Sequence, residues 1–151
     1  MRSCDAILLN RNTRILALDI GEVRTGLALS SVSGTEASAL QVLNTKELCL
    51  NNKELHTLIE DYEIDTIVIG LPLLADGSEG QQARRTRSLA AKILKGKDQS
   101  IQVEFFDESQ SSKTAQRRGH DLGFNMKDMR GKLDAHAAAV FLQAYLDTIV
   151  D

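Results

Sequence analysis

Residues 14–31 read RILALDIGEVRTGLALSS, and they predict the first part of a β-sheet. Two apolar runs, Ile15–Ile20 and Leu27–Leu29, flank a short polar turn that carries Gly21 and Gly26. Glycines between two runs of strand-forming residues are typical of a β-hairpin. We therefore expect two antiparallel strands here.

Asp19 interrupts the first apolar run of this hairpin. A strand residue at this place is expected to be buried or half-buried, and an unpaired buried carboxylate costs several kcal/mol. Asp19 should therefore be paired, protonated or bound to a cation. A simpler alternative is that Asp19 only shapes the turn ahead of Gly21, and the hairpin alone does not distinguish the two.

The length and composition predict one ordinary globular domain. A chain of 151 residues is long enough to bury most of the surface that unfolding exposes. No apolar run approaches the ~20 residues of a membrane helix, and the apolar patch near the N-terminus is too short for a signal peptide. Cys4 and Cys49 show no metal-ligand spacing, so neither a disulfide framework nor a zinc site is expected. We expect a protein of a reducing cytoplasm.

The order of the predicted elements indicates an α/β fold. Strands are expected at 15–20, 27–29, 39–43, 65–70 and 101–106, and helices at 46–62, 81–94, 109–118 and 132–149. Ser78 followed by Gln81 predicts a capping box at the start of the second helix. A hairpin followed by strand–helix units implies a mixed five-stranded sheet with helices on both faces. Residues 1–13 are expected to be an N-terminal leader before a single domain, 14–151, and residues 119–131 to be a mobile loop.

Basic residues are concentrated in two segments although the net charge is −3. Residues 81–97 contain six basic residues and no acid, and residues 113–132 contain six more with two acids. A surface polarised in this way can bind a phosphate backbone, although solvated helix faces would give the same pattern. The residues expected to contact nucleic acid are Arg24, Arg84, Arg85, Arg117, Arg118, Lys127, Arg130 and Lys132.

Three carboxylates stand at the ends of predicted elements. Asp19 and Glu108 follow the first and last strands, and chemistry in α/β sheets gathers at the carboxyl ends of strands. Asp134 shares a helix face with Ala138 and Phe141, so it should point toward the sheet. Its alternative role, stabilising the helix dipole by ~0.3–1 kcal/mol, suits an exposed acid better than one on a buried face.

Carboxylates that converge repel one another unless a cation neutralises them. Mg²⁺ and Mn²⁺ are hard ions that prefer oxygen ligands. Two such ions about 3.5–4 Å apart can activate a water and stabilise the leaving oxygen of a phosphodiester. Acids around Mg²⁺ or Mn²⁺, flanked by basic helices, therefore predict phosphodiester hydrolysis.

Four motifs in the chain resemble those of one family. They are LDIGxxxxGLA at 18–28, IVIGLPxxxDGSE at 67–79, DExxSS at 107–112 and LDAxAA at 133–138. In this order they resemble the YqgF family, whose members are also called RuvX-like pre-16S rRNA nucleases or Holliday junction resolvases. The resemblance covers residues 14–147.

The resemblance implies a ribonuclease H-like fold and a divalent-metal nuclease with Asp19, Glu108 and Asp134 as its acidic triad. It implies a role in the cytoplasm, in maturing the 5′ end of the 16S rRNA precursor. The alternative is the resolution of branched DNA, as in related resolvases of this fold. The expected partner is nucleic acid and not a membrane; association with the ribosome, and a monomer or a homodimer, stay open.

The chain departs from the family pattern at two positions. Ser109 follows Asp-Glu where the family usually has Arg, and Ser31 stands where Asp is common. Serine cannot replace the bidentate phosphate contact of a guanidinium, so substrate binding is expected to be weaker or supplied by Arg117, Arg118 or Arg130. Glu22 is an extra acid close to Asp19.

Two rival functions remain compatible with the sequence. The motif around Asp19 also resembles the phosphate loop of actin-like and sugar-kinase folds, although one domain cannot form their nucleotide cleft. A non-catalytic nucleic-acid-binding protein of the same fold is the second rival. Aromatic residues make up only 4% of the chain, so contact with nucleic acid should be led by the backbone and sensitive to salt.

Overall fold

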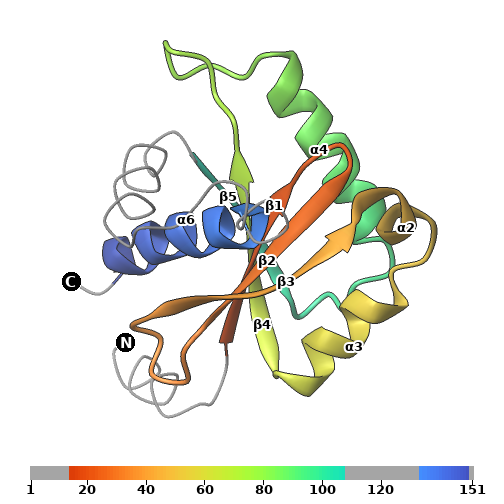
Figure 1. The fold of residues 1–151 in the computed structure, drawn as a ribbon, viewed down its shortest axis with the longest axis vertical. Coiled ribbons are helices and arrows are strands. Elements are labelled where there is room, and N and C mark those ends of the chain that lie inside the picture. The colour runs from red at the N-terminus through yellow and green to blue at the C-terminus, as the bar shows by residue number, and fades with distance from the viewer. Residues whose placement is uncertain (1–13, 108–132, 150–151) are drawn as a thin grey trace.

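The computed structural model describes residues 14–107 and 133–149, with the backbone alone at residues 133 and 134. The predicted hairpin is confirmed, because β1 (Arg14–Ile20) and β2 (Arg24–Ser30) pair antiparallel. β3 (Ala37–Asn44) extends this hairpin, and β4 (Ile64–Leu71) and β5 (Gln102–Asp107) lie parallel to β1 on its other side. The result is the predicted five-stranded mixed sheet, in the order β3-β2-β1-β4-β5 (Figure 1).

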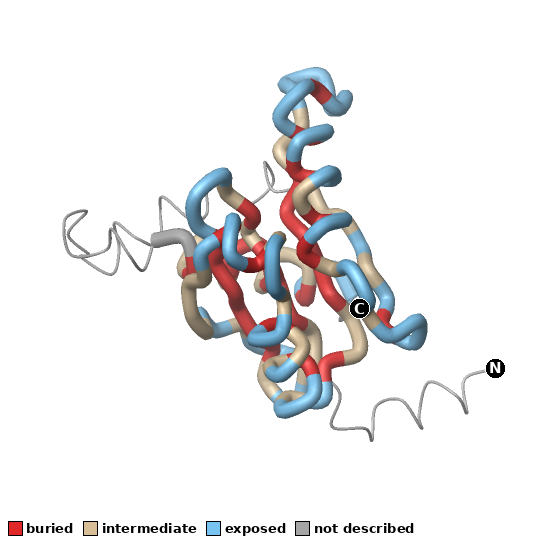
Figure 2. The backbone as a smooth tube through the Cα atoms, turned by 90° about the vertical axis from the view of Figure 1, so that its right-hand side faces the viewer, coloured by how far each residue is buried: buried red, intermediate tan, exposed pale blue. Residues whose placement is uncertain are grey.

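Helices cover both faces of the sheet, as the element order predicts. α2 (Thr45–Leu50), α3 (Lys53–Asp61) and α4 (Gln81–Ile93) lie on one face, and α6 (Leu133–Ile149) lies on the other (Figure 1). The strand period of two divides β1 between these faces, because Leu16, Leu18 and Ile20 belong to the first core and Ala17 to the second. Figure 2 shows the buried strands enclosed by helices whose outer sides are exposed.

α6 packs against a sheet surface made of small and β-branched side chains. Ala17, Ala28 and Val68 meet the buried face of the helix, which consists of Ala138, Phe141, Leu142 and Leu146. The amide of Gln143 joins the helix to the start of β3, because it accepts from the Ala37 N–H at 3.0 Å and donates to the Thr35 carbonyl at 3.0 Å. α6 therefore lies across β1, β2 and β4, and the Gln143 amide attaches it to the start of β3.

The helix predicted over 46–62 is wrong as a single element. It is broken at Asn51 and Asn52 into α2 and α3. The side-chain amide of Asn52 donates to the carbonyls of Ile93 and Lys95, both at 2.8 Å. These carbonyls lie at the end of α4, so the break gives them donors that a continuous helix would not offer.

The predicted capping box at Ser78 and Gln81 is also wrong. α4 begins after Gly80, which makes no side-chain capping bond. Ser78 instead donates its N–H and its hydroxyl to the Asp76 carboxylate, at 2.9 and 2.6 Å. These bonds lower the pKa of Asp76 and shape the 72–80 loop from within.

Three predicted segments lie outside the described residues: the leader 1–13, the helix 109–118 and the loop 119–131. Among the helices of residues 14–107 and 133–149, none combines the length and apolarity needed to cross a membrane.

Asn52→Asp tests the tertiary role of the break. Aspartate has the shape of asparagine but cannot donate to the carbonyls of Ile93 and Lys95, so we expect a loss of about 1–3 kcal/mol in the free energy of unfolding. Urea denaturation measures the change. Asn51→Asp is the matched control, because Asn51 is exposed and only accepts from the Lys53 N–H, and it should change stability by no more than about 0.5 kcal/mol. Equal effects of the two variants would contradict this role.

Candidate functional site

Asp19 is half-buried at the carboxyl end of the central strand, as predicted, and strand alternation places it on the face covered by α6. Its neighbours across the sheet are glycines. Gly26 of β2 lies directly opposite, and continuing the Leu18–Ile69 register by one residue brings Gly70 of β4 level with it. Because neither neighbour carries a side chain, the two strands beside Asp19 contribute only glycine backbone on this face, and we call this place the niche.

β5 points alternate side chains toward the same face. The Tyr145 hydroxyl of α6 donates to the Glu104 carboxylate. The rings of Phe106 and Tyr145 pack edge to face, with their centres 5.8 Å apart. Burial and the nearby carboxylate raise the pKa of Tyr145, so its proton stays in this bond. Strands lie about 4.8 Å apart, so β5 is roughly 10 Å from β1. Position 108 has the parity of residues 104 and 106, but Glu108 lies outside the described residues.

The structure places the backbone of Asp134 in the first turn of α6. The residues four and seven positions later, Ala138 and Phe141, are buried against the sheet beside Ala17. Helical periodicity therefore puts position 134 on the sheet-facing side of the helix. The side chain of Asp134 is not described. Residues 14–107 and 135–149 hold no group of three potential metal ligands.

Two buried threonines fix the turn that follows Asp19. Thr45, the first residue of α2, donates its hydroxyl to the Gly21 carbonyl at 2.8 Å. Because that proton is used, the Thr25 hydroxyl donates to Thr45 Oγ1, also at 2.8 Å. The Thr45 N–H donates to the Val23 carbonyl at 2.9 Å. No motif in the sequence pointed to this network, which joins the hairpin turn at residues 21–25 to the start of α2, 20 to 24 residues later.

Three of the predicted nucleic-acid-binding residues are described, and they gather at the Asp19 end of the sheet. Arg24 begins β2, Arg84 lies in the first turn of α4, and Arg85 forms an ion pair with Glu22 of the hairpin turn. All three are exposed. The other predicted contacts lie outside the described residues: Arg117, Arg118, Lys127, Arg130 and Lys132.

Arg87 of the same basic segment is engaged within the protein. It donates twice to the Glu79 carboxylate at 2.7 Å, and its guanidinium lies 4.3 Å from the centre of the Phe105 ring. This pairing lowers the pKa of Glu79, so the carboxylate keeps its charge at lower pH than usual. Arg87 thus joins the loop after β4 to β5.

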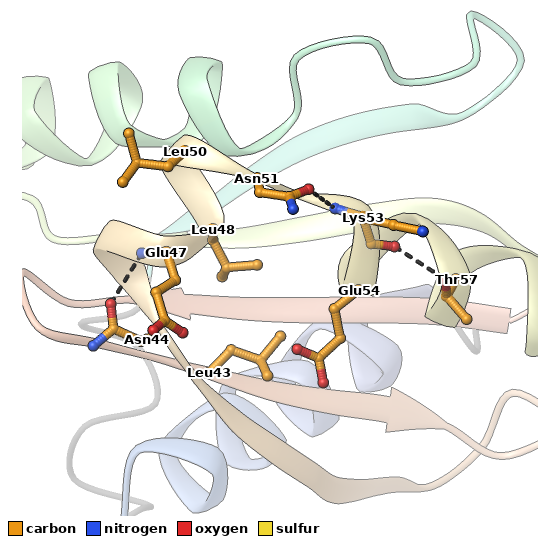
Figure 3. Close-up of a pocket in the computed structure, with 9 residues that line it drawn as sticks. All are labelled: Leu43, Asn44, Glu47, Leu48, Leu50, Asn51, Lys53, Glu54 and Thr57. Carbon is orange, nitrogen blue, oxygen red and sulfur yellow. Dashed lines mark hydrogen bonds between the residues drawn. The ribbon is translucent and has the colours of Figure 1, made fainter.

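Among the described residues, two of the cavities have volumes large enough for a ligand. The larger, of about 550 Å³, lies between β3, α2 and α3, and Figure 3 shows the Glu47 and Glu54 carboxylates on either side of Leu43 within it. These acids would repel a phosphate, and no residue of the niche lines this cavity. The smaller cavity, of about 340 Å³, lies between the hairpin turn and α4, and Ile20 is one of the residues that line it. This cavity is next to Asp19 in the chain, because Ile20, the following residue, lines it.

The mixed five-stranded sheet with helices on both faces is the ribonuclease H-like fold of the RuvC-like resolvases. Solved structures confirm this fold. The chain matches T. thermophilus RuvC in complex with a Holliday junction at a TM-score of 0.59 and 14% identity, covering 90% of this chain and 94% of that one. It matches the Fowlpox virus resolvase bound to Holliday junction DNA at a TM-score of 0.53 and 13% identity, covering 91% and 99%.

The chain belongs to the RuvX family. The family model, described as Holliday junction resolvase, matches residues 13–148. A protein of Anaeromyxobacter sp. (strain Fw109-5) is 38% identical over 134 residues, which are 89% of this chain and 96% of that protein. One of Sulfurihydrogenibium sp. (strain YO3AOP1) is 37% identical over 138 residues, or 91% and 92%. Both are named "Putative pre-16S rRNA nuclease", and the family predicted from the four motifs is confirmed.

Thr45→Val tests the threonine network. Valine keeps the shape of threonine but leaves the Gly21 carbonyl without its donor and the Thr25 hydroxyl without its acceptor. We expect a loss of about 1–3 kcal/mol in the free energy of unfolding, measured by thermal or urea denaturation. Thr57→Val is the control, because the exposed Thr57 hydroxyl donates only to the Lys53 carbonyl within its own helix. A Thr45→Val protein as stable as the control would rule out the network as a support of the turn.

Proposed function

We propose that this chain is a divalent-metal-dependent nuclease that hydrolyses phosphodiester bonds at the 5′ end of the 16S rRNA precursor, in the cytoplasm. The observation that carries the proposal is Asp19, a half-buried carboxylate in a glycine-lined niche at the end of the central strand. The names of the relatives support the reaction and the substrate.

The residues proposed to hold the metal are Asp19, Glu108 and Asp134. Two observations support this set: Asp19 lies in the niche, and position 134 lies on the sheet-facing side of α6. Glu108 is included because the family resemblance implies it. Carboxylate oxygens are the ligands that Mg²⁺ and Mn²⁺ prefer, and we propose one of these ions as the cofactor. The ion, when bound, supplies an activated water and stabilises the charge that develops on the leaving oxygen.

The chain's own residues position the substrate. Gly26 and Gly70 leave room for a phosphate beside Asp19, and the threonine network holds the following turn. Arg24, Arg84 and Arg85 lie at the same end of the sheet and are proposed to contact the nucleic acid, with Arg24 and Arg84 binding flanking phosphates. Contacts of this kind weaken steeply with added salt.

Branched DNA is the second candidate substrate. The description of the family model, Holliday junction resolvase, favours it. An assay of end-labelled rRNA precursor and of a four-way DNA junction, run side by side with Mg²⁺ and Mn²⁺, distinguishes the two. Faster cleavage of the junction would replace the RNA proposal, and binding without cleavage of either would favour the non-catalytic rival.

Asp19→Asn tests the metal-binding role of the niche. The amide keeps the shape but loses the charge that a cation requires, so we expect metal-dependent cleavage to fall about 100-fold or more. EDTA should abolish cleavage by the unchanged protein, and Mg²⁺ or Mn²⁺ should restore it. Glu108→Gln and Asp134→Asn should have effects of the same size.

Asp61→Asn is the matched control, because Asp61 is exposed at the end of α3. It should cleave like the unchanged protein. Cleavage that survives EDTA, or survives the three substitutions together, would show that the acids at positions 19, 108 and 134 are not the site.

Gly70→Ala tests whether the niche must stay open. Alanine in a strand is easier to order than glycine by about 0.5–1 kcal/mol, so the variant should fold. Its methyl group would project beside Asp19, and we expect cleavage to fall about 10-fold while the melting temperature is maintained. Full activity in a protein with native circular dichroism would show that neither substrate nor ion uses the space over Gly70.

A further inference from the structure

The smaller cavity has no role in the function proposed so far. It adjoins the niche along the chain, because its wall begins at Ile20, the residue after Asp19. Strand alternation puts the two residues on opposite faces of the sheet, so the niche and the cavity flank the end of β1. A nucleic-acid strand with a phosphate in the niche and the next nucleotide in the cavity would cross the hairpin turn.

The size of the cavity suits one planar group. Ligand pockets usually have volumes of ~300–1,000 Å³, and this one, at about 340 Å³, is at the small end. A duplex does not fit such a volume, whereas a single unpaired base does. Unpaired bases are also the parts of RNA that proteins read by sequence.

The side chains of the cavity match the surface of a nucleobase. Ile20 and Leu89 supply apolar contact for the face of a ring, and the amides of Gln81 and Gln82 can donate to or accept from its edge. Glu22 adds a carboxylate, which only accepts, and Arg85 adds a guanidinium, which only donates. The cavity therefore offers acceptor and donor groups side by side.

Guanine is the base that fits this pair. Its N1–H and N2–H₂ groups are adjacent donors and can bind both oxygens of one carboxylate, while its O6 and N7 are the acceptors that arginine prefers. Adenine, cytosine and uracil each place an acceptor next to the donor that would meet the carboxylate, so Glu22 would repel part of their edge.

The ion pair between Glu22 and Arg85 can open at small cost. The Glu22 and Arg85 side chains are 67% and 50% exposed, and ion pairs at such exposed positions contribute little to stability. In the free protein each charge has a partner; with guanine in place, each would gain hydrogen bonds to the base.

We propose that this cavity binds one unpaired guanine next to the scissile phosphate and gives the nuclease a base preference at that position. The inference rests on the proposed function for the cleavage step, but the cavity can be tested without it.

The first test measures binding in the absence of metal. The full chain, in EDTA, is titrated with the 5′-monophosphates of guanosine, adenosine, cytidine and uridine, and the amide signals of Gly21, Glu22, Gln81 and Gln82 are followed by NMR. All four ligands carry the same phosphate, so differences report on the base. We expect the guanosine nucleotide to bind about 10-fold more tightly than the others and to shift these signals.

Glu22→Gln is the decisive variant. Glutamine keeps the size of the side chain but replaces one acceptor by a donor, so the preference for guanine should fall about 10-fold. Arg84→Gln is the matched control, because Arg84 lies beside Arg85 in the chain but does not line the cavity. This variant should lower the affinity for all four nucleotides equally. Equal binding of the four nucleotides, or a preference that persists in Glu22→Gln, would overturn the proposal.

The second test links the cavity to cleavage. In an rRNA precursor oligonucleotide, each guanosine around the cut is replaced in turn by inosine, which lacks the N2 amino group. Cleavage should fall about 10-fold at one position, and this effect should be absent in Glu22→Gln. A preference for guanosine in binding, without any cleavage, would support the guanine-binding cavity and contradict the nuclease function. Metal-dependent cleavage without any base preference would support the nuclease function and contradict the guanine-binding cavity.

Discussion

The constraint on which this structure depends is the placement of one carboxylate inside a sheet. Asp19 is half-buried in the middle strand, where a charge is tolerated only with compensation. We propose that a bound cation contributes to that compensation. Gly26 and Gly70 place no side chain beside the carboxylate, and the first turn of α6 lies on the same face. A side chain at either glycine would have filled that space with apolar atoms.

The two faces of the sheet carry hydrophobic cores of different size and composition. The face under α2, α3 and α4 carries the larger core, with Leu16, Leu18 and Ile20 from the central strand, and it supports the hairpin turn through Thr45. The face under α6 carries smaller side chains, so that one helix can lie across several strands. The larger core and the proposed metal site thus lie on opposite faces of β1, since Ile20 belongs to one face and Asp19 to the other.

Local pattern was enough to predict elements, but not what joins them. The hairpin, the β-branched run of β4 and the buried face of α6 follow from periodicity, and all three are confirmed. The helix over 46–62 failed because the amide of Asn52 caps the end of α4, 41 and 43 residues away in sequence. The half-burial of Asp19 was predictable from its apolar neighbours. The alignment of Asp19 with Gly70 was not predictable, because no local sequence pattern specifies the register between two parallel strands.

The charges near the site explain how an acidic protein can bind a polyanion selectively. Two arginines of α4 are already paired, Arg87 with Glu79 and Arg85 with Glu22. Any phosphate would have to displace the bidentate Glu79 from a guanidinium that also lies on Phe105, which makes Arg87 a poor phosphate site. The Glu22–Arg85 pair is more exposed and has a cavity beside it, so it yields more easily to a ligand that satisfies both charges. A bare phosphate satisfies only the arginine, and the carboxylate then selects against it in favour of a base with donors of its own.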